Sequence, residues 1–303
     1  MHVITNMLGY ILGITLYFVG IGLWVIVLAW LVAWGFVFLI PVLPALAIAF
    51  LAGYCTNFLK QREEWPQFRA LYAWKYIRRH YFRYSVYGDE AGVKLTTDKA
   101  HREKQREEGK RYIWAVYPHG HYSLTALFYW ALNPDFTWTR GAVHSALFYV
   151  PVLGSIMGWI GAIGVTRGEM ETALASGHSL VMCPGGVADI ANTGNDVKQR
   201  RGFITLAHKT GATVVPVWCP DERGYYRQWL PLGRLTERLF GFPVPLFIYG
   251  RWWCPFLPLA AKQSRIYVGT PIDCSQGTFE ENLADFWTQF AALQRQAGEW
   301  KSK

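Results

Sequence analysis

Residues 8–54 are apolar along their whole length, without the periodic polar positions of a surface helix or strand. No Lys, Arg, Asp or Glu occurs before Lys60. A helix needs about 20 apolar residues to cross a bilayer, so the run predicts a transmembrane hairpin over residues 1–59, or one crossing with a re-entrant piece. A removable signal peptide is not expected, because no positively charged n-region precedes the apolar run. A buried helical pair inside a soluble domain is the alternative.

Prolines at 41 and 44 fit a bend or the start of a second crossing, because proline lacks the N–H that lipid cannot replace. The position of the turn is left open.

Basic and aromatic residues follow the apolar run. Residues 60–85 carry seven Lys or Arg against two Glu, together with several Trp and Tyr. Positive charge beside a membrane segment marks the cytoplasmic side, and Trp and Tyr suit the headgroup layer. We therefore predict a cytosolic domain downstream.

Residues 87–111 are polar and read as a solvated loop or surface helix. The range 60–111 is thus predicted to be a basic juxtamembrane segment and linker. From residue 112 onward, short β-rich apolar runs alternate with helix-like segments, which indicates an α/β sheet flanked by helices in a domain of residues 112–303. The expected strands are 112–117, 161–166, 179–183, 213–218 and 265–270, and the expected helices lie near 122–132, 145–157, 168–177 and 200–210.

The last segment has the pattern of an amphipathic helix. Apolar side chains recur at steps of four, three, four and three residues, at Phe279, Leu283, Phe286, Phe290 and Leu293. Thr278 followed by Glu281 forms a capping box at the expected start of the helix.

Composition narrows the class of protein. The chain of 303 residues has a formal net charge of +9, which suits an anionic membrane surface. Nucleic acid is the other usual partner of a basic protein, but no zinc-finger spacing or RNA-binding aromatic signature occurs, so we expect no nucleic-acid binding. The five cysteines are widely spaced and never form CxxC, so neither a disulfide framework nor a zinc site is indicated. We expect no metal and no resident cofactor.

The stretch YPHGHYS at 117–123 follows the expected strand 112–117. Ligands of α/β sheets bind beyond the carboxyl ends of strands, and Pro118 and Gly120 sharpen the turn that carries His119. A histidine titrates near neutral pH and is the usual general base. An ordinary hydrogen-bonded turn histidine is the alternative. The sequence contains no GxSxG, GxxxxGK[ST], GxGxxG or HExxH motif. None of these motifs supplies a protein nucleophile beside the histidine. This suits a reaction in which the substrate itself supplies the nucleophile, such as an alcohol that attacks a thioester.

Six blocks, in order, resemble the type-two diacylglycerol acyltransferase family, which includes monoacylglycerol acyltransferases and wax synthases, within the wider superfamily of glycerolipid acyltransferases. They are YPHG, GAIGVTRGEM, CPGGVADI, RRGFITLAHKTGATVVPVW, YGRW and IYVGTPI, between about residues 112 and 275. The resemblance implies a glycerolipid-acyltransferase-like sheet behind a membrane anchor.

The resemblance identifies His119 with the catalytic histidine of the family's HPHG motif. Tyr117 stands where many members have the first histidine. Asp189 occupies the place of a family Glu. The wider superfamily often pairs the histidine with an Asp five positions later, which is Leu124 here. We therefore expect Asp189 to orient His119, with a cap of the following segment as the alternative role.

The same blocks supply candidates for substrate binding. We expect Arg167, Arg201 and Arg251 to meet the phosphates of coenzyme A, because guanidinium forks match phosphate oxygens; surface solvation is the alternative. Backbone donors near Gly120, or near Gly185 and Gly186, are candidates for an oxyanion site. The remaining candidates are Pro118, His121, Phe203 and Gly250.

Taken together, these residues predict an acyl-CoA-dependent O-acyltransferase that converts diacylglycerol to triacylglycerol, with acyl-CoA as co-substrate and His119 as general base. A monoacylglycerol or wax-alcohol acyltransferase, a lysophospholipid acyltransferase and a non-catalytic lipid-binding protein are the alternatives. PGGVAD in place of an EGTR-like block favours a neutral acceptor over a phosphorylated one. We expect the endoplasmic reticulum membrane or the lipid droplet as the location. The acyl length and oligomeric state, a homodimer included, are left open.

Overall fold

A central sheet organises the chain. The computed structural model describes residues 64–149, 153–189, 199–228, 248–251, 254, 257–259 and 263–299. Eight strands of this part form one sheet in the order β1-β9-β6-β2-β5-β3-β4, and β10 pairs with β6 outside that path. The strands are β1 (Ser85–Gly88), β2 (Tyr112–Tyr117), β3 (Thr139–Val143), β4 (Ile163–Gly164), β5 (Ser179–Met182), β6 (Thr213–Trp218), β9 (Arg265–Val268) and β10 (Ile272–Asp273).

The middle of the sheet is parallel. β2 lies between β5 and β6 and runs parallel to both, and β3 and β4 continue the parallel order beyond β5. β9 and β10 are antiparallel to β6, and β1 pairs with β9 in parallel. The carboxyl ends of β2, β5 and β6 therefore meet at one edge, and the expected α/β sheet flanked by helices is confirmed.

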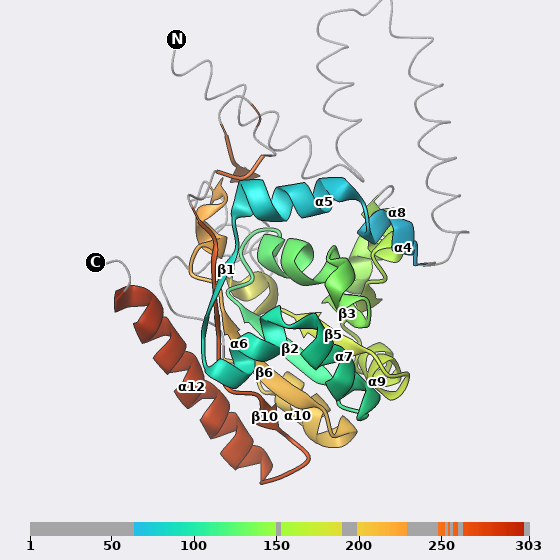
Figure 1. The fold of residues 1–303 in the computed structure, drawn as a ribbon, viewed down its shortest axis with the longest axis vertical. Coiled ribbons are helices and arrows are strands. Elements are labelled where there is room, and N and C mark those ends of the chain that lie inside the picture. The colour runs from blue at the N-terminus through green and yellow to red at the C-terminus, as the bar shows by residue number, and fades with distance from the viewer. Residues whose placement is uncertain are drawn as a thin grey trace, which may run out of the picture.

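Helices cover both faces of the sheet. On one face lie α9 (Arg167–Ala175), α10 (Gly202–Thr210) and α12 (Phe279–Glu299). On the other lie α6 (Glu90–Thr97) and the π-helix η2 (Ala126–Ala131), with α7 (Lys99–Glu107) next to α6. Figure 1 shows α12 running along one side of the sheet. β2 alternates between the faces: Ile113, Ala115 and Tyr117 join the α10–α12 core, whereas Trp114 and Val116 join the core under η2.

The expected strands at 112–117 and 213–218 have the observed bounds, and β5 and β9 lie within theirs. The expected strand 161–166 is reduced to β4 because Gly161 has a φ of 68° and Thr166 already caps α9 through a bond to the Glu169 N–H. The expected helix 145–157 is instead a 3₁₀-helix, η4 (Ser145–Tyr149), and α8 (Leu153–Trp159).

The C-terminal helix forms as expected. The Thr278 N–H donates to Glu281 Oε2 at 2.8 Å, and the Glu281 N–H donates to Thr278 Oγ1 at 3.3 Å. This reciprocal pair satisfies two donors at the start of the helix. The apolar positions of its stripe from Leu283 onward are buried against the sheet.

The segment predicted as a juxtamembrane region and linker contributes structure of its own. It contains α4 (Pro66–Arg69), α5 (Tyr72–Tyr76) and the π-helix η1 (Ile77–Phe82), followed by β1, α6 and α7. β1 is a strand of the central sheet. The predicted hairpin 1–59 lies outside the described residues. Within the described ranges, no helix has both the length and the apolar character needed to cross a bilayer.

Short elements complete the fold. They are η3 (Pro134–Phe136), η5 (Gly186–Asp189) and η6 (Glu222–Gly224), and the separate pair β7 (Arg227–Gln228) and β8 (Ile248–Tyr249). η5 follows β5 and η6 follows β6, so both turns lie at the edge where β2 ends.

Candidate active site

The turn after β2 places His119 at the carboxyl edge of the parallel strands. Its Nδ1 lies 2.8 Å from the carbonyl oxygen of Gly120. A carbonyl can only accept a hydrogen bond, so Nδ1 carries the proton and Nε2 keeps its lone pair. Burial lowers the pKa of His119 below its ordinary value of 6.5, although the Gly120 carbonyl and Asp189 act in the opposite direction. At neutral pH the imidazole is therefore uncharged and able to take up a proton at Nε2.

Asp189 comes to the same site from the neighbouring strand. It ends η5, and its side chain has no exposed surface. A Cβ at position 185 would lie 1.7 Å from Asp189 Oδ2, so the carboxylate occupies space that only a glycine at 185 leaves open. The negative charge of Asp189 favours the protonated imidazole of His119 and so acts to raise its pKa. The two residues expected to work together are close in space, while the hydrogen-bond partner that orients Nδ1 is the Gly120 carbonyl.

Glu222 is a second buried carboxylate at this edge, and the sequence analysis missed it. It lies in η6, directly after β6, and is 3% exposed. Its Oε1 accepts from the Leu124 N–H at 2.6 Å, and its Oε2 accepts from the Thr125 N–H at 2.9 Å. Both N–H groups lie at the N-terminus of the helical segment that continues as η2. A helix N-terminus favours a negative charge. Burial raises the pKa of Glu222 to about 7.

Glu222 also shapes the turn that holds His119. Gly120 has a φ of 61°, a conformation that favours glycine, and a Cβ there would lie 2.6 Å from Glu222 Cγ. The carboxylate thus packs against Gly120 and holds the backbone of Leu124, five residues after His119. Leu124 stands at the chain position where the wider superfamily often has its Asp, and Glu222 binds the backbone N–H of that residue.

The loop that carries Glu222 is fixed by its neighbour Asp221. The Arg265 guanidinium donates to both Asp221 oxygens, at 3.0 and 2.7 Å, and the Arg265 N–H donates to Oδ2 at 2.9 Å. One signal could have revealed Glu222: an acidic residue just past a strand that neighbours β2 must lie near His119. The charged neighbours of Glu222 in the stretch PDERG, residues 220–224, are instead typical of a solvated turn.

The nearby hydroxyl and thiol are not arranged as nucleophiles. Ser123 donates from Oγ to the backbone oxygen of His119 at 3.0 Å. Burial raises the pKa of the Cys183 thiol to about 12, so the reactive thiolate is absent at neutral pH. In the described ranges, no three His, Cys, Asp or Glu side chains are grouped as ligands for a metal ion. In the described residues, His119 therefore has no activated protein nucleophile beside it.

Other expected site residues surround the turn. Pro118 is buried, and the half-buried His121 has its ring 6.3 Å from that of Tyr226. Tyr117, which replaces a histidine of the family motif, is buried against Phe290 of α12 at a ring separation of 5.1 Å. The Gly186 N–H already donates to the Cys183 carbonyl at 3.0 Å. Gly186 is therefore a poor oxyanion donor, and Gly120 and Gly185 are the remaining candidates.

A cavity of about 580 Å³ brings three of the expected residues together. Arg167, Arg201 and Phe203 all line it, and so does Arg200. Pro184, next to Gly185, forms another part of the wall and connects the cavity to the loop of Asp189. The N-terminus of α10, a helix of nine residues, opens beside Arg201. Cationic side chains and a helix N-terminus together favour a phosphate.

Arg251 and Gly250 lie elsewhere. Arg251 donates from Nε to Tyr81 Oη at 3.2 Å, and its guanidinium carbon lies 5.4 Å from the centre of the Tyr81 ring. Gly250 precedes it and is buried. Neither residue lines the cavity of Arg167 and Arg201, so the structure brings together two of the three arginines expected to act as one group.

The chain is similar to known lipid acyltransferases. Diacylglycerol O-acyltransferase 1 of Schizosaccharomyces pombe is 25% identical, and the match covers 67% of this chain and 66% of that protein. Diacylglycerol O-acyltransferase 2 of Dictyostelium discoideum is 33% identical over 54% of this chain and 57% of its own length. The chain thus spans about half to two thirds of the curated relatives it matches.

Among solved structures, the 1-acyl-sn-glycerophosphate (LPA) acyltransferase of Thermotoga maritima matches with a TM-score of 0.46 at 16% identity, covering 78% of each chain. The family model described as diacylglycerol acyltransferase matches residues 40–297. That range includes the His119 turn and both buried carboxylates, and it extends over most of the sequence. The chain therefore belongs to the diacylglycerol acyltransferase family.

Proposed function

We propose that this protein is an acyl-CoA-dependent O-acyltransferase that transfers a fatty acyl group to the free hydroxyl of diacylglycerol and so makes triacylglycerol. One observation carries the proposal within this family. His119 is a neutral imidazole whose Nδ1 is held by the Gly120 carbonyl, so that Nε2 can accept a proton. No activated protein nucleophile accompanies it in the described site, and the substrate alcohol fills that role.

In the proposed step, His119 Nε2 takes the proton of the acceptor hydroxyl while its oxygen attacks the thioester carbonyl of acyl-CoA. The C–O ester bond forms and the C–S bond breaks. The sulfur leaves with the bonding electron pair and receives the proton from the imidazolium, so His119 returns to its neutral form. N–H groups of Gly120 and Gly185 are the proposed donors to the oxygen that becomes negative during the attack.

Asp189 has an electrostatic role in this proposal. His119 becomes positively charged when it takes the proton, and a fully buried carboxylate nearby favours that charge. The Gly120 carbonyl sets the tautomer in the resting state, and Asp189 lowers the free energy of the imidazolium.

Coenzyme A is proposed to bind at the cavity lined by Arg167, Arg200 and Arg201. The arginines of the lining suit its phosphates, and the side chains of Met170 and Met182 offer an apolar wall for its aliphatic arm. The charges of Arg200, in the cavity lining, and of Asp189 both act on Tyr117, which supports a location of this cavity near the His119 turn.

We propose that the domain faces the cytosol and lies on the endoplasmic reticulum membrane or the lipid droplet. Aromatic and aliphatic side chains at the start of the described chain support this orientation. Tyr72 is 72% exposed, and Tyr76, Trp65 and Leu71 are also exposed. Such side chains suit the headgroup layer, where a bilayer-soluble acceptor would enter.

We also propose that the acceptor of the acyl group is a neutral alcohol. PGGVAD follows β5 and holds Asp189 against Gly185, without a basic residue for an acceptor phosphate within the motif. This supports a neutral alcohol. Human 2-acylglycerol O-acyltransferase 3 is 26% identical over 71% of this chain, so monoacylglycerol is the second candidate acceptor.

The test is His119→Ala in the full chain, with labelled acyl-CoA and a panel of diacylglycerol, monoacylglycerol, long-chain alcohol and lysophospholipid. Loss of the base should lower kcat by about 10²- to 10⁴-fold. His101→Ala, in the surface helix α7, is the matched control and should keep its activity. If His119→Ala formed product at the rate of the control, the acyltransferase mechanism would be wrong and the lipid-binding alternative favoured.

A further inference from the structure

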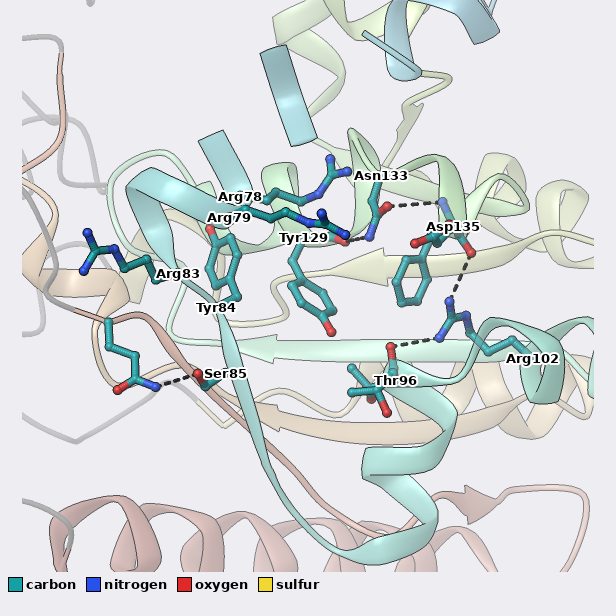
Figure 2. A pocket seen from close by; sticks show the side chains of 13 residues that line it. Arg78, Arg79, Arg83, Tyr84, Ser85, Thr96, Arg102, Tyr129, Asn133 and Asp135 are labelled. Carbon is teal, nitrogen blue, oxygen red and sulfur yellow. Dashed lines mark hydrogen bonds between the residues drawn. The ribbon is translucent and has the colours of Figure 1, made fainter. Parts of the chain in front are cut away.

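A second arginine-lined cavity, of about 630 Å³, lies between η1, the start of β1, the helices α6 and α7, and η2 with η3. Arg78, Arg79, Arg83 and Arg102 all line it. Figure 2 shows Arg78 and Arg79 on one wall, Arg102 and Thr96 on another, and Tyr129 between them. The catalytic scheme uses none of these residues.

The positive charge of this cavity is poorly compensated. Among the described residues, no salt bridge involves any of its four arginines, and Asp135 is the one acidic side chain in its lining. Asp135 is itself 4.0 Å from Lys99. Burial lowers the pKa of both Arg78 and Arg102, which means that their charges are partly withdrawn from water. Carboxylates act on these charges only from beyond salt-bridge distance, Asp135 on both and Asp98 and Glu103 on Arg102. A desolvated guanidinium without a paired carboxylate is stabilised by a bound anion.

Two of the arginines are held in place by the fold. Arg78 donates to the Leu132 carbonyl at 2.8 Å, and Arg102 donates to the carbonyls of Leu95 and Thr96 at 3.0 and 2.8 Å. Backbone carbonyls orient a guanidinium but do not neutralise it. Arg79 and Arg83 are exposed at the mouth of the cavity. Arg83 also donates from Nε to the His80 carbonyl at 3.3 Å. The arrangement combines two half-buried cations with two exposed ones.

Uncharged donors complete the lining. Burial raises the pKa of Tyr129 to about 12, so its hydroxyl keeps its proton at neutral pH. Ser85 adds a hydroxyl on the opposite side. Several charge-assisted donors around one space suit a phosphate group, which offers more acceptor oxygens than a carboxylate. The volume leaves room for the group to which the phosphate is attached.

This cavity is separate from the proposed coenzyme A site. It adjoins the face of the sheet where Trp114 packs against Phe136, itself part of the cavity wall. Arg201 and Phe203 lie on the opposite face, where Phe203 packs against Phe286 of α12. The two arginine groups share no lining residue.

We propose that the cavity of Arg78, Arg79, Arg83 and Arg102 is a second ligand site that binds the phosphomonoester group of an anionic ligand. A phosphatidate headgroup and the 3′-phosphate of a nucleotide present this chemistry. The inference stands beside the proposed function and does not depend on it.

The test is calorimetric titration of the full chain in uncharged detergent, in an Arg201→Gln background that weakens the other arginine cavity. The probes are dihexanoyl phosphatidate, adenosine 3′,5′-bisphosphate and, as the uncharged reference, dihexanoylglycerol. Arg79→Gln with Arg83→Gln removes two exposed charges and leaves Arg78 and Arg102 in place; the bond from Arg83 Nε to the His80 carbonyl, at 3.3 Å on the surface, is lost with it. Lys94→Gln with Lys104→Gln, on α6 and α7 outside the cavity, is the matched control.

We expect at least one phosphate probe to bind saturably, with affinity about tenfold weaker in the arginine pair and unchanged in the lysine pair. Binding of phosphatidate alone would identify a lipid headgroup as the source, and binding of the bisphosphate would identify a nucleotide. The proposal is overturned if neither phosphate probe binds, if the diacylglycerol binds equally well, or if the lysine pair weakens binding as much as the arginine pair.

Discussion

Asp189 and Glu222 are both buried carboxylates, and they follow the two strands on either side of β2. Their partners differ. Asp189 acts through its charge on the imidazole of His119, whereas Glu222 accepts hydrogen bonds from the backbone N–H groups of Leu124 and Thr125. The comparison teaches that equal burial and nearly equal position do not give equal contacts: the charge of Asp189 acts on the proposed base, whereas Glu222 holds the backbone of the turn.

The largest effect is expected from Glu222→Ala. The change leaves two buried N–H groups without an acceptor, which costs about 1–3 kcal/mol each. For a domain of this size the melting temperature should fall by roughly 5–15 °C. Thermal unfolding of the full chain in detergent measures it. A fall no larger than that of Asp189→Ala would erase the distinction between the two carboxylates.

Asp189→Asn should leave the melting temperature nearly unchanged and lower kcat by about 10- to 100-fold, because the imidazolium loses a stabilising charge. Asp189 raises the pKa of His119, so its neutralisation should also move the acid limb of the pH–rate profile to lower pH. The profile of kcat/KM against pH checks this shift. An unmoved acid limb with a large loss of stability would make Asp189 a structural residue like Glu222.

Glu222→Gln tests the pH dependence of stability. Burial raises the pKa of Glu222 to about 7, from an ordinary value of 4.5. The folded chain therefore keeps a proton that the unfolded chain has released, and this contribution to stability is full below about pH 4.5 and declines as the pH rises through 7. The decline is at most about 1.4 kcal/mol per pH unit.

Melting temperatures of wild type and Glu222→Gln between pH 4.5 and 8 measure this contribution. The difference between the two proteins should change with pH in this direction. Asp189→Asn serves as the control, and a pH-independent difference for Glu222→Gln would contradict a raised pKa for this carboxyl.

The smallest effect is expected from Arg201→Ala, in the cavity that connects to the loop of Asp189. Loss of one exposed phosphate contact should raise the KM for acyl-CoA by about fivefold and leave kcat within about twofold. Initial rates against acyl-CoA concentration separate the two constants. An equal loss in both would place Arg201 with the reacting groups, and no change in either would leave the cavity without a role in acyl-CoA binding.

The sequence predicted the regular parts of this fold well. Strands 112–117 and 213–218 are continuous runs of β-formers that are buried on both faces, and such runs carry their own signal. β1 and β3 were missed because their residues look polar. In β3, Arg140 is tolerated because it pairs with Glu64 at 2.5 Å, a contact between residues distant in the chain.

The sequence revealed some residues of the candidate site and not others. The charge of Asp189 acts on His119, and the orienting role that the sequence assigned to Asp189 stays a prediction. Glu222 could not be recognised from a local pattern, because it lies among charged neighbours and its role depends on backbone donors 97 and 98 residues away. Arg251 was grouped with Arg167 and Arg201 because each lies in a block of the family resemblance and carries a guanidinium, and the structure separates it from the cavity that the other two line.

The position of β2 inside the sheet has a consequence for how acceptor preference can evolve. β2 is hydrogen-bonded along both edges, to β5 and to β6. A displacement of the backbone before His119 would break both ladders at once, so descendants of this chain have little freedom to move the base toward a differently shaped alcohol. Diversification is expected instead in the connecting loops around a stationary histidine, where a new substrate costs no rearrangement of the framework.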